Sequence, residues 1–239
     1  MKQYAIIFIL TLFLLFSGCL TDSDRLPQET WAVGSYNHET NMITTDDPLT
    51  LIIKNTSEIP LMNNTRVLVY FIVDNRIDDR TAEIIVRDIS DVSAPLIYIT
   101  EDNKDDFLTN YAVEYYNMWI GQDYLTIMFN FWIENDKKEH KFFLSLDIRE
   151  KEEDEEDEED EEGDEDDEDE VENINLTFHH EGNSSFAYSK RGNVISVDIN
   201  ELKDIFPTKD SVELVITFPR TPNYDNPDNF EKHSIWYKY

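Results

Sequence analysis

A regular alternation of apolar and polar residues restricts the fold of this chain more than any other feature of its sequence. The alternation is clearest over residues 124–134, where one face carries Leu125, Ile127, Phe129, Phe131 and Ile133. Successive side chains of a β-strand point to opposite faces of its sheet. A period of two therefore predicts a strand that is buried on one side.

The same period recurs along most of the chain. We expect further strands at residues 65–74, 81–89, 95–100, 142–148, 176–178, 195–199 and 212–218. Turns rich in Gly, Asn and Asp separate them. The one convincing helical turn covers residues 200–206, with Asn200 as its N-cap and Pro207 as its stop. About ten short strands with regular turns predict an all-β sandwich or barrel.

Acidic residues are concentrated in one tract. Residues 150–172 hold 20 Asp or Glu residues and one Lys, which gives the tract a net charge of −19. Such a tract repels itself and has no apolar surface to bury, so we expect it to be disordered. Because it lies between two strand patterns, we interpret it as an insert in a hairpin loop. Its spacing is not that of an EF-hand, and we expect only weak cation binding.

The remaining charge argues against two classes of partner. The formal net charge is −32, and −13 remains outside the acidic tract. An acidic body lacks the basic patches that attract phosphates, which argues against nucleic-acid binding. It is also repelled by anionic lipid headgroups. A polar break at residues 101–106 predicts two domains, at residues 36–103 and 104–239.

The chain opens with the features of an exported protein. One positive charge precedes residues 4–16, in which only Thr11 is polar. This run is shorter than the ~20 residues of a spanning helix but has the length of a signal-peptide core. We assign residues 1–18 to a signal peptide that is cleaved between Gly18 and Cys19.

The cleavage site also predicts a lipid anchor. The sequence LFSGC at residues 15–19 resembles a lipobox, although Phe16 replaces the usual aliphatic residue. Cys19 is the only cysteine, so it has no disulfide partner within the chain. We expect several acyl chains on Cys19 to hold the protein to the bilayer, since one chain alone binds weakly. The alternative is an ordinary signal peptide with a cysteine there by chance.

We interpret residues 19–35 as the lipidated cysteine followed by a flexible tether. The segment lacks apolar periodicity, and Asp22 and Asp24 resemble the acidic signal that exports lipoproteins to the cell surface in Bacteroidetes. We therefore expect an outer-membrane lipoprotein. Its orientation, at the cell surface or on the periplasmic face, stays open.

No catalytic motif is present in the sequence. It contains no G-x-S-x-G, P-loop, G-x-G-x-x-G or H-E-x-x-H pattern. We therefore predict no enzymatic activity, no cofactor and no metal site. His179 and His180 point to opposite faces if they lie in a strand, so we expect one at the surface and one at an interface.

Four aromatic residues are candidates for a sugar or peptide groove, namely Trp119, Trp132, Trp236 and Tyr237. Aromatic residues at strand positions more often belong to the core or to a sheet surface, which is the alternative interpretation.

Several strand and turn phrases carry a resemblance to a known family. The lipobox is followed by RVLVYFIVD, YLTIMFNFWIENDKKEHKFFLSLD, LTFHHEGN, NVISVDINELKDIFP and VELVITFP, and the chain has an aromatic end. This arrangement resembles the NigD-like proteins of Bacteroidetes over nearly the whole mature chain. The resemblance implies a small OB-like barrel followed by a β-sandwich. The family name comes from a bacteriocin-associated operon, and the acidic tract departs from the family pattern.

Two functions follow as hypotheses. The first is a non-enzymatic envelope module that binds a protein or a glycan. The second is a protective protein that sequesters a cationic peptide through its acidic tract.

Overall fold

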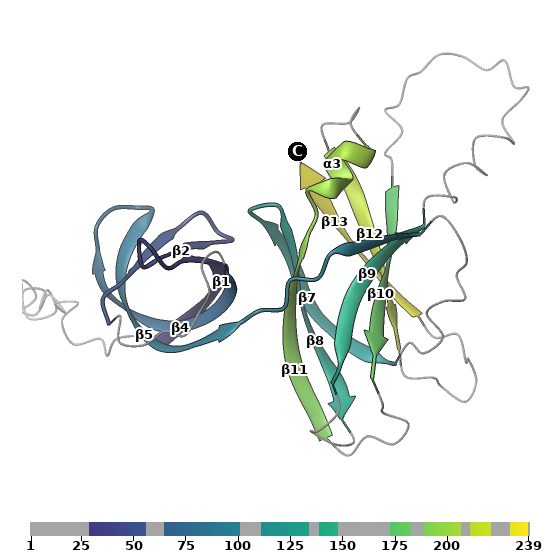
Figure 1. Ribbon diagram of the computed structural model, residues 1–239, viewed down its shortest axis with the longest axis horizontal. Coiled ribbons are helices and arrows are strands. Elements are labelled where there is room, and N and C mark those ends of the chain that lie inside the picture. Colours follow the sequence, from purple (N-terminus) through teal and green to yellow (C-terminus); the bar gives the residue numbers. More distant parts are fainter. Residues whose placement is uncertain are drawn as a thin grey trace, which may run out of the picture.

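The computed structural model describes residues 29–55, 65–100, 111–133, 139–147, 173–182, 189–206, 211–220 and 230–238. The predicted signal peptide, Cys19, most of the predicted tether and the acidic tract lie outside these residues. The described residues form a closed barrel and two further sheets, which confirms the predicted all-β class. Figure 1 shows the barrel beside the sandwich that the two sheets form.

The barrel is small and consists of five strands: β1 (Glu29–Asn37), β2 (Met42–Thr45), β3 (Thr50–Ile53), β4 (Thr65–Arg76) and β5 (Thr81–Asp91). The strand order β1-β2-β3-β5-β4 closes by the pairing of β4 with β1. Within the barrel, only β3 and β5 pair in parallel. This connectivity agrees with the predicted OB-like barrel, a five-stranded Greek key. Its interior holds Tyr36, Ile43, Leu51, Val67, Val69, Phe71 and Ile84.

The first strand begins earlier than we predicted. Residues 29–35, which we had placed in the tether, pair with β4 in β1. β1 also pairs with β2, so this segment closes the barrel. The strand was missed because it opens with exposed positions, and the buried Val33 and Tyr36 are too few to set a clear period of two.

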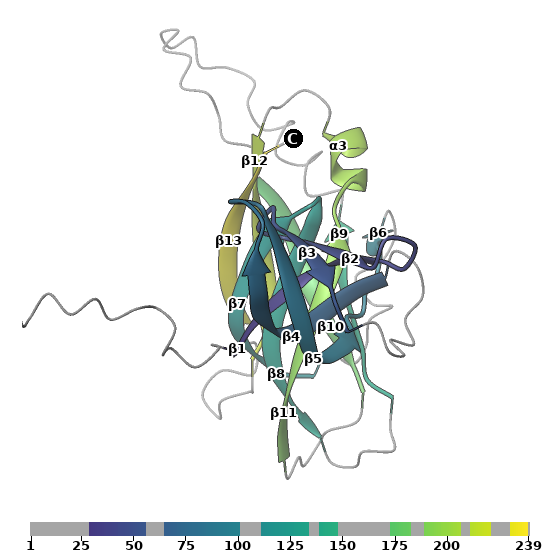
Figure 2. The same ribbon diagram turned by 90° about the vertical axis from the view of Figure 1, so that its left-hand side faces the viewer.

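The sandwich has eight strands: β6 (Ile97–Thr100), β7 (Val113–Gly121), β8 (Tyr124–Ile133), β9 (Lys141–Asp147), β10 (Asn173–Glu181), β11 (Ser189–Asp198), β12 (Ser211–Pro219) and β13 (Phe230–Lys238). Five of them form a sheet in the order β13-β12-β10-β9-β6, and three form a sheet in the order β11-β8-β7. The three-stranded sheet lies nearer the barrel in Figure 1. Figure 2 views the molecule from the barrel side, with the sandwich behind the barrel.

The change of domain also comes earlier than the predicted boundary at residue 103. β6 pairs in parallel with β9, with Ile97 opposite Leu144, and so belongs to the sandwich. The sequence pattern did not reveal this, because an alternating strand has the same pattern in either domain. Only its hydrogen-bonded partner decides which sheet it joins.

The core of the sandwich is rich in aromatic rings. Phe129 makes edge-to-face contacts with Phe142 and Phe178, at ring-centroid distances of 4.8 and 5.0 Å. Phe178 in turn contacts Phe218 at 5.1 Å, so one cluster joins both sheets. Burial of each of these rings contributes ~1.5–3 kcal/mol. The two sheets are therefore held face to face by residues that the period of two placed on their inner sides.

The acidic tract connects two neighbouring strands. β9 and β10 pair antiparallel, and Leu146 lies opposite Leu176 near the end at which the chain leaves for the tract. The described strands therefore flank the tract as those of a hairpin would. The tract itself lies outside the described residues, so its disorder stays a prediction.

The predicted helical turn is confirmed as α3 (Glu201–Ile205), but its predicted cap is not. Asn200 is itself helical, at φ −60° and ψ −34°, and its side chain makes no capping hydrogen bond. Instead its Nδ2 donates to Asp198 Oδ1 at 3.0 Å. Within the described ranges, no helix is long and apolar enough to cross a membrane.

Candidate functional site

The barrel meets the three-stranded sheet of the sandwich through a buried arginine. Arg66 in β4 forms an ion pair with Asp46 of the barrel, with 2.6 Å between Nη2 and Oδ1. The same Nη2 donates to Ser196 Oγ of β11 at 3.0 Å. The side chains of Arg66 and Asp46 are only 2% and 5% exposed. A buried arginine needs such partners, because desolvation of an unpaired charge costs several kcal/mol.

Further contacts hold the two domains in one arrangement. Gln122, in the β7–β8 turn, donates from Nε2 to the carbonyl oxygens of Thr44 and Thr45 at 2.6 and 2.7 Å. The guanidinium of Arg66 lies 4.4 Å from the ring centre of Tyr124. Gly121 leaves the space that Asp46 fills, since a Cβ on Gly121 would lie 2.6 Å from the Asp46 Cα. The domains are thus joined by specific contacts as well as by the connecting chain.

A cleft opens beside this junction, with a tryptophan from each domain. Trp31 of β1 and Trp119 of β7 face each other at a ring-centroid distance of 6.2 Å and an angle of 53°. Trp119 Nε1 donates to Asp46 Oδ2 at 2.7 Å, which fixes the orientation of its ring. Trp31 is 46% exposed. Both rings line a cavity of about 720 Å³, which we call the tryptophan cleft.

The lining of the tryptophan cleft is apolar inside and polar at its edge. The barrel contributes the apolar side chains of Val33, Leu51, Phe71 and Ala82. Charged groups follow in the β2–β3 connection, at the end of β4 and in the β4–β5 connection, namely Asp47, Arg76 and Asp79. Concave sites of this kind, with apolar walls and a few polar groups, are typical of ligand-binding sites. Within the described residues, no three His, Cys, Asp or Glu side chains are grouped so that they could hold a metal ion.

The four predicted aromatic residues do not converge on one surface. Trp119 lines the cleft. Trp132 lies in the same sheet, with Lys190 Nζ 5.9 Å from its ring centre. Trp236 is 50% exposed on β13, in the other sheet. Tyr237 is buried.

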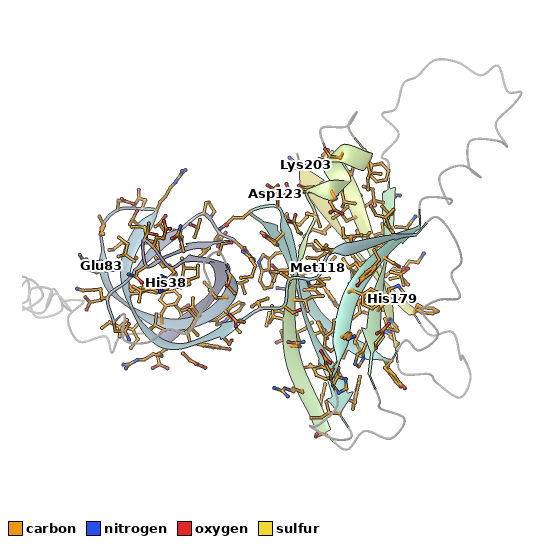
Figure 3. The ribbon with its side chains drawn as sticks, viewed as in Figure 1. His38, Glu83, Met118, Asp123, His179 and Lys203 are labelled. Atoms are coloured by element: carbon orange, nitrogen blue, oxygen red, sulfur yellow. The ribbon has the colours of Figure 1, made fainter. Side chains whose placement is uncertain are left out.

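Tyr237 has a structural role at one end of the sandwich. Its hydroxyl donates to Asp123 Oδ1 at 3.0 Å, and Lys203 Nζ of α3 donates to the same oxygen at 2.8 Å. Figure 3 labels Asp123 and Lys203 close to each other at that end. Burial raises the pKa of Tyr237 to about 12, so its hydroxyl remains a proton donor. These contacts tie α3 to the β7–β8 turn.

The prediction that one of the paired histidines lies at the surface was wrong. His179 and His180 point to opposite faces of β10, as expected, but both are buried. His179 Nε2 is hydrogen-bonded to Ser145 Oγ at 2.7 Å, and its ring stacks on Phe143. His180 Nε2 lies 3.0 Å from His140 Nδ1. Burial lowers the pKa of both His179 and His180 to about 4, so both are neutral at pH 7.

Sequence reasoning missed the residues that build the tryptophan cleft. Trp31 stood in the segment assigned to the tether, and Asp46 and Arg66 looked like ordinary charged residues. The only local signal of a strand was the sequence WAVGSY after Thr30, which lies within β1 and contains several apolar residues. No local pattern indicates that Arg66 and Asp46 become buried, because the sandwich is what covers them.

Comparisons with known proteins agree with this architecture. The sequence profile described as NigD-like C-terminal beta sandwich domain matches residues 95–220. This match begins just before β6, in agreement with the domain change seen in the sheet pairing. No match to a curated protein was found.

Several solved structures share the fold along almost the whole chain. A NigD-like immunity protein from Bacteroides caccae is 16% identical, with a TM-score of 0.61 over 90% of this chain and 98% of that one. A protein described as toxin-related from Parabacteroides distasonis is 20% identical, with a TM-score of 0.60 over 88% and 94%. A protein described as a lipoprotein from Bacteroides fragilis is 11% identical, with a TM-score of 0.59 over 89% and 98%. At these identities the likeness establishes the fold alone.

Proposed function

We propose that this chain, which belongs to the NigD-like family by the match over more than half of its length, is a non-enzymatic envelope lipoprotein that binds a ligand in the tryptophan cleft. The observation that carries the proposal is the pair Trp31 and Trp119, which come from different domains, contact each other and both line the cavity. Aromatic rings offer large apolar faces at low conformational cost, which suits them to binding.

The rigid junction supports a preformed site. Asp46 pairs with Arg66 and also holds Trp119, so the contact that joins the domains also orients one wall of the cleft. A site that is already in its binding conformation loses less entropy when the ligand arrives. The cleft is therefore suited to recognition without rearrangement of the domains.

The side chains that line the cleft suit the binding role proposed here. Its ionisable side chains in the described residues are Asp46, Asp47, Arg76 and Asp79. Asp46 is engaged by Arg66 and by Trp119. No serine, cysteine or histidine lines the cavity, so the usual pairing of a nucleophile with a base is missing from its described lining. The similar structures compared above carry no enzyme names.

The lipobox supports the proposed location. Cys19 precedes β1 by a short segment, so acyl chains on Cys19 would hold the barrel near the bilayer. We propose an outer-membrane anchor, with the protein on either the periplasmic or the surface side. Protease added to intact cells distinguishes the two, because only a surface protein is cut before the envelope is opened.

The binding proposal is tested by capture from an envelope extract. Immobilised wild type is compared with the double variant Trp31→Ala/Trp119→Ala and with Trp236→Ala, which removes an exposed tryptophan from the other sheet. We expect wild type and Trp236→Ala to retain the same protein or carbohydrate, and the double variant to lose it. Equal retention by all three proteins would exclude the tryptophan cleft as the binding site.

A second candidate is sequestration of a cationic peptide by the acidic tract. The net charge of −19 and the names of the two relatives described as immunity and toxin-related proteins favour it. Deletion of residues 152–170 removes 18 carboxylates and no described strand. If the tract is the working element, this deletion abolishes binding of hexalysine at low salt. If the cleft is the working element, its ligand binds equally well to the deletion variant and with weak salt dependence.

A further inference from the structure

A second cavity lies along the same junction between the barrel and the sandwich. Its volume is about 530 Å³, and its lining includes Tyr70 from β4, Tyr116 from β7, Met128 and Asn130 from β8, and Gly192 from β11. Tyr70 and Tyr116 are both exposed, at 44% and 73%. We call this cavity the tyrosine cleft.

The two clefts adjoin along both walls. On the barrel wall, Trp31 lines the first cleft and its cross-strand partner Tyr70 lines the second. On the sandwich wall, Asn117 lines the first cleft and its partner Met128 lines the second. Directly paired residues in a sheet lie ~5 Å apart, so the linings of the two cavities meet at both walls. The two clefts therefore lie next to each other along the domain junction.

The polar groups of the tyrosine cleft are mainly uncharged. Asn130 Nδ2 donates to Glu114 Oε2 at 3.1 Å, which fixes the orientation of its amide. Gly192 lies opposite Asn130, and a Cβ there would sit 3.4 Å from its Oδ1, so the glycine leaves the amide uncovered. Ser90 and Asn193 add a hydroxyl and a second amide, and Asp91 is the one charged residue of the described lining.

We infer that the two neighbouring clefts form one groove that binds a neutral oligosaccharide chain, an inference that rests on the proposed function of the tryptophan cleft. Sugar rings have apolar C–H faces that pack on tryptophan and tyrosine, and hydroxyl groups that both donate and accept hydrogen bonds. An amide side chain also does both, since its oxygen accepts hydrogen bonds and its nitrogen donates them. The amides of Asn117 and Asn130 therefore match such hydroxyls. Aromatic rings along both clefts suit a chain of repeated, similar units.

The lining of the groove holds few charged groups, which suits a neutral ligand. In the tryptophan cleft, Arg76 offsets one of the two negative charges that Asp47 and Asp79 contribute. In the tyrosine cleft, one aspartate stands among amides, a hydroxyl and aromatic rings. A strongly anionic glycan is disfavoured as well, because the chain is acidic outside its tract.

The first experiment measures retardation of the protein in native gels that contain soluble glucan, mannan, galactan or xylan. We expect at least one of these neutral polysaccharides to retard wild type and Trp236→Ala. The same polysaccharide should not retard Trp31→Ala. Failure of all four to retard wild type overturns the inference. If the double variant Trp31→Ala/Trp119→Ala loses a ligand that wild type retains from envelope extract in that case, the cleft is a binding site of other chemistry and the proposed function stands.

The second experiment tests the continuity of the groove by filling the tyrosine cleft. Gly192→Tyr adds a side chain there, with Ser189→Tyr, at an exposed position of β11 outside the cleft lining, as the matched control, and calorimetry compares the hexasaccharide and the disaccharide of the retarding polysaccharide. Gly192→Tyr should weaken hexasaccharide binding by about tenfold and leave disaccharide binding unchanged. Equal hexasaccharide affinity in all three proteins shows that the ligand does not enter the tyrosine cleft. Binding of hexalysine that Trp31→Ala removes would assign the groove to basic peptides instead.

Discussion

Asp46 of the barrel accepts a hydrogen bond from the indole Nε1 of Trp119 in the sandwich at 2.7 Å. The other oxygen of the same carboxylate pairs with Arg66 at 2.6 Å. One buried side chain therefore fixes both the junction of the domains and one wall of the tryptophan cleft. Stability and binding should consequently change together when this residue is altered.

Asp46→Asn tests the energetic role of this carboxylate. The variant keeps the size of the side chain but leaves Arg66 buried without a counter-ion, which should lower the free energy of unfolding by about 3–5 kcal/mol. Urea denaturation followed by tryptophan fluorescence measures the loss.

The exposed pair of Lys54 and Asp74 provides the matched control. These side chains are 46% and 38% exposed, at 2.7 Å from Nζ to Oδ2. Asp74→Asn should leave the free energy of unfolding almost unchanged, since water screens exposed pairs. Equal losses in Asp46→Asn and Asp74→Asn would contradict the assigned role of Asp46.

Gly121→Ala tests the fit between the domains. A Cβ at Gly121 would lie 2.6 and 2.7 Å from the Cα and O of Asp46, so the β7–β8 turn and the barrel must separate. Overpacking of this kind costs about 1–3 kcal/mol, and the fluorescence of Trp119 should change as its contact with Asp46 loosens. Gly192→Ala, where the nearest atom lies 3.4 Å away, should leave stability unchanged or slightly raised. A Gly121→Ala protein with unaltered melting temperature and fluorescence would argue against a tight junction.

The buried histidines predict a loss of stability in acid. His179 and His180 have pKa values lowered from 6.5 to about 4 by burial, so the unfolded chain binds protons that the folded chain excludes. The contribution of these neutral histidines to the free energy of unfolding is complete above about pH 6.5. It is lost as the pH falls toward 4, and the total loss is roughly a few kcal/mol. Denaturation midpoints measured across this pH range give the slope of stability against pH. His179→Gln removes one of these two titrating groups, so its stability should depend less steeply on pH than that of wild type. An identical pH dependence in the two proteins would assign the acid sensitivity to other groups.

Cys19→Ser tests the lipid anchor. Without the thiol no thioether can form, so the variant should remain unprocessed or leave the membrane fraction. Fractionation of cells followed by immunoblotting measures both outcomes, with wild type as the control. A fully processed Cys19→Ser protein that still sediments with membranes would place the anchor elsewhere.

The sequence by itself determined the class of fold and the position of most strands. Alternation is a local property, so residues such as Leu125, Ile127 and Phe129 reveal a strand and its buried face without knowledge of the partner strand. The helical turn of α3 was equally local, because a proline at position 207 marks in the sequence where a helix should stop. The resemblance to the NigD-like family also rested on short strand phrases, and the profile match confirms it.

Only the tertiary structure decided which strands pair and which polar side chains become buried. β1 closes the barrel and β6 joins the sandwich, although neither strand carries a local mark of its partner. Arg66 and Ser196 lie 130 positions apart in the chain, yet they bond at the domain junction. A pattern of residues determines which face of a strand avoids water, but not what covers that face. The two clefts were therefore invisible in the sequence, since they exist only where the barrel docks on the sandwich.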